Sequence, residues 1–82
     1  MEVNPSWRIM LRYTFRVALT SEQLLALYRG EAQRFSVMSE QGLRIELPIH
    51  HLRRFVSHGG IHGRFRLTTD ENHRFIDLER LA

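Results

Sequence analysis

The chain has 82 residues, of which Leu, Ile, Val and Phe make up 25, a share typical of folded globular proteins. It contains no cysteine, which excludes disulfides and thiolate chemistry, and its longest apolar run, over residues 24–28, is too short to span a membrane. The net charge is only +3, so charge alone is a weak argument for a nucleic-acid partner. We expect one domain over residues 1–82, with residues 1–6 as a loose extension, in a cytoplasmic protein without a signal peptide.

The first predicted element is a strand over residues 7–19. Apolar side chains occupy every odd position of this stretch, whereas Arg8, Arg12 and Arg16 lie at even positions. Such period-two alternation is typical of a half-buried antiparallel strand. Thirteen residues would span roughly 43 Å at ~3.3 Å per residue. We therefore expect the strand to bend, as long strands in small barrels do.

A helix is predicted next, over residues 21–29. Thr20 and Gln23 have the spacing of a capping box, and Gly30 is placed to end the helix. Leu24 and Tyr28 are four residues apart and share one face, so we expect them to pack on the sheet.

Two hairpins with a short helix between them account for the rest of the chain. Alternation around Phe35 and Val37, a turn over residues 40–42, and alternation around Ile45 predict the first hairpin. Residues 48–55 predict a short helix, and residues 57–63 a glycine-rich loop. A fourth strand over residues 64–68 is followed by an element over residues 73–81 that suits a strand or a helix. The hairpin context favours a strand.

These elements predict an α+β fold in the order β-α-β-β-(short helix)-β-β. We expect a small curled antiparallel sheet or partly open barrel with one helix packed on the sheet. Phe55 is expected to be buried, so that its truncation to alanine would cost about 3–5 kcal/mol. The predicted core is Ile9, Leu11, Tyr13, Phe15, Val17, Leu24, Tyr28, Phe35, Val37, Ile45, Leu47, Leu52, Phe55, Phe65, Leu67 and Phe75.

All twelve basic residues are arginine, and residues 44–66 hold five of them against one glutamate. If the fourth strand lies beside the first, five guanidinium groups share one surface that suits nucleic-acid phosphates. The alternative is that these arginines only solvate the outer face of the sheet. The candidate nucleic-acid-binding residues are Arg8, Arg12, Arg16, Arg64 and Arg66.

The histidines offer a second hypothesis, a metal site. His51, His58 and His62 are the candidate ligands, but their spacing matches no zinc finger and no cysteine or carboxylate stands nearby. We therefore expect ordinary loop histidines, and neither a metal nor another cofactor.

The chain is not expected to be an enzyme or to take a small-molecule substrate, since so small a domain has little interior for a pocket. The leading hypothesis is a non-enzymatic nucleic-acid-binding module. The alternative is a protein-interaction or self-assembling module, such as a homodimer, that acts through sheet edges. Trp7, near the amino terminus, suits either a dimer contact or closure of the core.

Several motifs resemble a family of short, single-domain bacterial proteins, the domain-of-unknown-function family numbered twenty-eight thirty-five. The resemblance covers about residues 11–81, and its most specific parts are "LRRFV" and "GIHGRF". It implies a stand-alone cytoplasmic bacterial protein and carries over no activity, cofactor or catalytic residue. The matching residues are Ser21, Glu22, Tyr28, Arg29, Gly30, Gly42, Pro48, Leu52, Arg53, Phe55, Gly60, Ile61, His62, Gly63, Arg64, Phe65, Asn72, Phe75 and Leu78.

Overall fold

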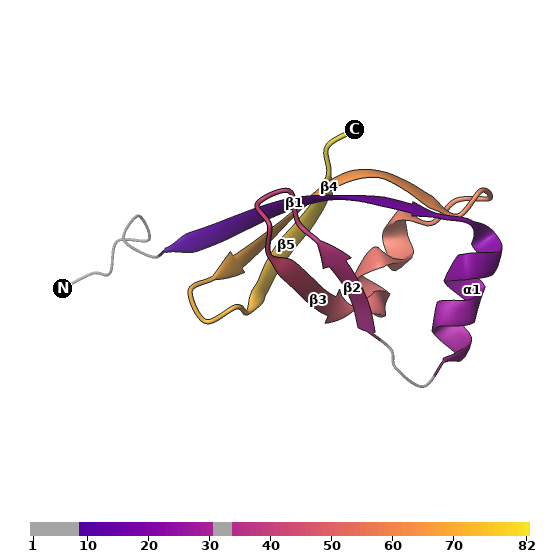
Figure 1. The fold of residues 1–82 in the computed structure, drawn as a ribbon, viewed down its shortest axis with the longest axis horizontal. Helices are drawn as coiled ribbons and strands as arrows, with labels where there is room; N and C mark the ends of the chain where they lie inside the picture. Colours follow the sequence, from indigo (N-terminus) through magenta and orange to yellow (C-terminus); the bar gives the residue numbers. More distant parts are fainter. Residues whose placement is uncertain (1–8, 31–33) are drawn as a thin grey trace.

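A three-stranded antiparallel sheet is the larger of two sheets (Figure 1). The computed structural model describes residues 9–30 and 34–82, so Trp7, Arg8 and the predicted extension over residues 1–6 lie outside the described part. Strands β1 (Met10–Leu19), β4 (Ile61–Asp70) and β5 (Phe75–Arg80) pair in the order β1-β4-β5. β1 pairs with β4 over its whole length, from Met10 opposite Asp70 to Leu19 opposite Ile61.

The second sheet is a hairpin of β2 (Arg34–Met38) and β3 (Arg44–Pro48). Gly42 has a φ of 86°, a left-handed conformation that suits glycine in the connecting turn. The arrows of β2 and β3 run across those of β4 and β5 in Figure 1, so the hairpin crosses the larger sheet and does not extend it. The expectation of one curled sheet or partly open barrel is thus corrected to two antiparallel sheets, without barrel closure among the described residues.

Helix α1 (Ser21–Arg29) follows β1 directly and has the predicted ends. The Thr20 side chain accepts a hydrogen bond from the Gln23 amide, and the Gln23 side chain accepts one from the Thr20 amide. The Gly30 amide donates to the carbonyls of Ala26 and Leu27. Leu24 joins the buried core, and Tyr28 packs against it. The capping box and the terminal glycine are therefore confirmed.

The segment after β3 is a 3₁₀ helix, η2 (Ile49–Phe55). Side chains three apart eclipse one another in a 3₁₀ helix, and Ile49, Leu52 and Phe55 accordingly face the core. Leu52 is fully buried, but Phe55 is only partly buried and meets the edge of the Phe65 ring at a centroid distance of 5.0 Å. The prediction that Phe55 is buried is corrected, because this last position of η2 lies where the chain leaves the core.

The glycine-rich loop forms a tight turn that packs on the β1–α1 junction. Ser57 and Gly60 exchange backbone hydrogen bonds of 2.8 and 3.0 Å, and the Ser21 hydroxyl donates to the His58 carbonyl. Gly60 has a φ of 103°, and an added Cβ would lie 2.0 Å from the Leu19 carbonyl oxygen. The motif "GIHGRF" therefore has a structural function here: it brings the chain past β1 and starts β4.

The last element is a strand, as the hairpin context favoured, but its inward face differs from the prediction. A register shift between Thr68 and Thr69 places Leu78 opposite Leu67, where Leu78 is fully buried. Phe75 is 41% exposed and Ile9 is 56% exposed, so both are removed from the predicted core. Leu11, Tyr13, Val37 and Tyr28 are partly buried. The core also contains residues that the prediction omitted, namely Ile49, Ile61 and Leu78.

The described residues contain no helix that is both long enough and apolar enough to span a membrane.

Candidate functional site

Four of the five predicted arginines lie on one face of the larger sheet. Arg16 on β1 is directly opposite Arg64 on β4, and Arg66 is opposite Thr14. Directly opposed residues of an antiparallel pair point to the same side of the sheet. Arg12 shares this side, whereas the Phe15–Phe65 pair points to the core. We call the surface formed by Arg12, Arg16, Arg64 and Arg66 the arginine face; Arg8 lies outside the described residues.

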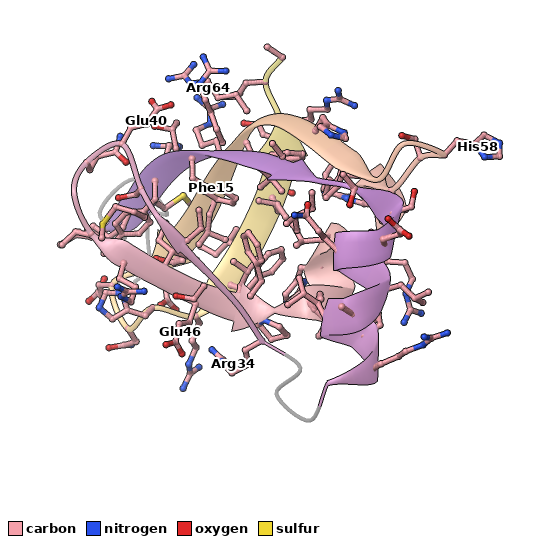
Figure 2. All side chains as sticks on the ribbon, turned by 45° about the vertical axis from the view of Figure 1, so that its right-hand side comes forward. Phe15, Arg34, Glu40, Glu46, His58 and Arg64 are labelled. Carbon is pink, nitrogen blue, oxygen red and sulfur yellow. The ribbon has the colours of Figure 1, made fainter. Side chains whose placement is uncertain are left out.

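Two arginines of this face are matched by carboxylates. Arg64 donates from Nε to Oε2 of Glu40 at 2.9 Å and from Nη2 to Oε1 at 2.8 Å, a bidentate pair. Figure 2 shows Glu40 and Arg64 close together outside the ribbon. Arg66 donates to Oε1 of Glu79 from Nε at 2.8 Å and also from Nη2. Guanidinium groups held in this way are less available to an external phosphate.

The Arg64–Glu40 pair also shifts the pKa of both groups. Hydrogen bonds from Arg64 and then from Thr14 lower the pKa of Glu40 from 4.5 to about 2. The same pair raises the pKa of Arg64 above its ordinary value. Both partners therefore remain charged across the whole physiological range.

Arg12 and Arg16 differ from the other two arginines. Both side chains are exposed, and neither forms an ion pair with a carboxylate in the described part of the chain. They lie four positions apart on β1, so their Cα atoms are roughly 13 Å apart at ~3.3 Å per residue. The available positive charge of the arginine face is thus concentrated along β1.

The tip of the β2–β3 hairpin holds the free edge of β1 at Thr14. The Glu40 amide donates to the Thr14 carbonyl at 2.7 Å, and the Thr14 amide donates to Oε1 of Gln41 at 3.0 Å. The Thr14 hydroxyl donates to Oε1 of Glu40 at 2.9 Å and accepts from Nε2 of Gln41 at 3.0 Å. The backbone groups of Thr14 that point away from β4 are therefore satisfied, which protects this part of an edge strand.

The opposite edge of the sheet is covered at Leu78. Backbone groups of alternate residues point to opposite sides of an antiparallel strand, and the Leu78 carbonyl points away from β4. Its oxygen accepts a hydrogen bond from the Arg54 guanidinium on η2. Nη2 of Arg54 also lies 3.8 Å from Oδ1 of Asp77.

A second cluster of basic residues lies on η2, where the sequence predicted a short helix and the candidate metal ligand His51. The three-residue repeat that turns Leu52 inward leaves His50 and Arg53 on one outward ridge and His51 and Arg54 on another. His51 stacks on Phe75 with ring centroids 3.8 Å apart and 8° between the planes. Burial, and then the charges of His50 and Arg54, lower the pKa of His51. The string "HHLRR" was the available signal.

The three candidate metal ligands are far from forming a site. His51 stacks on Phe75, and His62 is on β4 opposite Ala18. His58 lies in the 57–60 turn and points outward (Figure 2). No three His, Asp or Glu side chains of residues 9–30 and 34–82 come together in a way that suits a metal ion.

In a comparison with protein-family models, residues 11–81 match the family described as Protein of unknown function (DUF2835). The chain belongs to this family, which confirms the resemblance found in its motifs. No match was found among curated proteins or among solved structures.

Proposed function

We propose that the protein is a small non-enzymatic binding module that contacts nucleic-acid phosphates through the arginine face. The observation that carries the proposal is the β1–β4 register, which sets Arg16 opposite Arg64 and Arg12 on the same side. A cytoplasmic bacterial setting, which the family resemblance implied, is part of the same proposal.

The ion pairs assign different functions to the four arginines. Arg64 and Arg66 already have carboxylate partners, so they hold the surface in shape and contribute little net charge. Arg12 and Arg16 supply the phosphate contacts, spaced by about the rise of four base pairs at ~3.4 Å each. Two contacts give weak binding without sequence preference, because phosphate contacts carry no base information.

The test is a titration of single-stranded and duplex oligonucleotides at two salt concentrations. The double variant Arg12→Gln with Arg16→Gln should flatten the slope of log affinity against log salt by about 1.4 for single strands and about 1.8 for duplex. A matched control is Arg29→Gln with Arg44→Gln, which removes the same charge from exposed positions on α1 and β3. Absence of binding at low salt, or equal slopes for both double variants, would contradict the proposal.

A protein-interaction or self-assembling module is the second candidate function. Phe75 and Ile76 favour it, since both are more than 40% exposed beside the outer edge of β5. Against it, the edge carbonyl of Leu78 is satisfied by the Arg54 side chain, and the edge groups of Thr14 are satisfied by the Gln41 side chain and the Glu40 backbone amide. Light scattering at several protein concentrations distinguishes the two, because self-assembly depends on concentration and a phosphate-binding monomer does not assemble.

A further inference from the structure

A surface hollow of about 680 Å³ lies between η2 and β5. It is at the opposite edge of the larger sheet from β1, since the strand order is β1-β4-β5. Its volume is in the usual range for small-ligand sites. The side chains that line it are His50, His51, Arg53, Arg54, Phe75, Ile76 and Asp77.

Three aromatic rings form a column along this hollow. His50 and His51 have ring centroids 4.2 Å apart, and His51 and Phe75 follow at 3.8 Å in nearly parallel planes. His51 covers one face of Phe75, yet Phe75 remains 41% exposed. Part of Phe75 is therefore accessible to a further flat ring, such as a nucleobase, which stacks on aromatic side chains.

The hollow carries more positive than negative charge. Asp77 is its acidic side chain, and Nη2 of Arg54 lies 3.8 Å from it. Arg53 is exposed, forms no ion pair with a described carboxylate, and has its guanidinium carbon 6.0 Å from the Tyr28 ring centroid. His50 lies on the same ridge of η2 as Arg53, because residues three apart eclipse in a 3₁₀ helix. The Arg53 guanidinium and the His50 imidazole thus form a ridge of nitrogen groups beside the ring column.

We propose that this hollow binds a nucleobase carrying a phosphate group. The base contacts the exposed part of the Phe75 ring, and the phosphate is held by Arg53. Free nucleoside monophosphates and the terminal nucleotide of a strand share this chemistry. The inference is independent of the arginine face, which lies along β1 and uses different residues.

The test is an NMR titration of the labelled full chain with AMP, with adenosine and inorganic phosphate as the two halves of the ligand. AMP is expected to shift the amides of residues 50–54 and 75–77 and to bind more tightly than either half. Arg53→Gln and Phe75→Leu should each weaken AMP binding by about tenfold, or 1.4 kcal/mol. Both side chains are exposed, so neither change should prevent folding. Arg29→Gln is the charge-matched control and should leave AMP binding unchanged.

A short oligonucleotide with a terminal phosphate identifies the source of the ligand. If it binds the hollow more tightly than AMP, the natural ligand is a strand end; if it binds less tightly, the ligand is a free nucleotide. The double variant Arg12→Gln with Arg16→Gln should leave AMP binding intact, so failure of the arginine face does not remove this site. Absence of AMP-induced shifts, shifts elsewhere in the chain, or equal binding of phosphate alone would overturn the proposal.

Discussion

Gly59 and Gly60 are adjacent, yet the fold requires a glycine only at position 60. A Cβ at Gly60 would approach the Leu19 carbonyl oxygen to 2.0 Å at a φ of 103°, whereas a Cβ at Gly59 has nothing within 4 Å. The atoms that a Cβ at position 60 would meet belong to the backbone of the β1–α1 junction, which cannot move without disturbing β1. This explains in physical terms why a glycine stands at the first position of the motif "GIHGRF", directly before β4.

Gly60→Ala is therefore expected to be strongly destabilising. Backbone strain alone costs about 1–3 kcal/mol, and the clash with Leu19 adds to it. Gly59→Ala is the matched control and should change the free energy of unfolding by no more than about 0.5 kcal/mol. Urea denaturation of both variants measures the difference. Equal midpoints for the two variants would show that the close approach at Gly60 is absent in solution.

Glu40 gives the protein a defined acid response. Its pKa is about 2 in the folded chain and about 4.5 in the unfolded chain, because Arg64 and Thr14 stabilise the carboxylate. A lowered pKa adds stability that is fully present above the unfolded value and is lost as pH falls through the folded value. The contribution of Glu40 should therefore decrease between about pH 4.5 and about pH 2.

The variant Glu40→Gln tests this response. At neutral pH it should unfold at a lower urea concentration than the wild type, and the gap should close as pH approaches about 2. Glu71→Gln, in the β4–β5 turn, is the control and should show no such convergence. A gap that stays constant from neutral to acidic pH would contradict the assigned pairing with Arg64.

At the scale of elements, η2 shows how a three-residue repeat separates the core from the surface. Leu52 is 0% exposed, whereas the neighbouring Arg53 is exposed. Leu52→Ala should cost about 2–5 kcal/mol, as buried leucine truncations do. Arg53→Ala should stay within about 0.5 kcal/mol. Thermal unfolding of both variants measures this, and similar losses for both would show that η2 does not divide Leu52 and Arg53 between core and surface.

The hairpin tip and β1 make a second contact between elements, at a strand edge. The Gln41 side chain satisfies the Thr14 amide, the Glu40 backbone amide satisfies the Thr14 carbonyl, and both side chains bond the Thr14 hydroxyl. Removal of both side chains therefore leaves the Thr14 amide open to pairing with another chain. The double variant Glu40→Ala with Gln41→Ala should self-associate more than the wild type in sedimentation velocity. Glu71→Ala is the control, and a monomeric double variant would show that the side chains do not protect the edge.

For the whole molecule, the sequence predicted what local patterns determine. Alternation located β1, and the spacing of Thr20, Gln23 and Gly30 located both ends of α1. The separate hairpin, and the inward turn of Leu78 after the shift at Thr68, depend on contacts between distant segments and leave no local periodicity.

The candidate site shows the same limit. Alternation in the sequence identified the arginines on β1 and β4, but it did not identify the carboxylates that pair with two of them. Glu40 is 24 residues from Arg64 and Glu79 is 13 residues from Arg66, so neither pair follows from sequence spacing. The ridges of η2 were also missed, because the segment was interpreted with a helical repeat of three to four.

The central claim, that the arginine face contacts phosphates, is tested most directly by mapping the contact itself. A short single-stranded oligonucleotide without a terminal phosphate is added at low salt to the labelled full chain, and the amide shifts are followed by NMR. We expect shifts over residues 12–16 and 64–68, the central part of β1 and its partner segment on β4, and their loss in the Arg12→Gln with Arg16→Gln variant. Shifts confined to other surfaces, or no shifts at low salt, would contradict it.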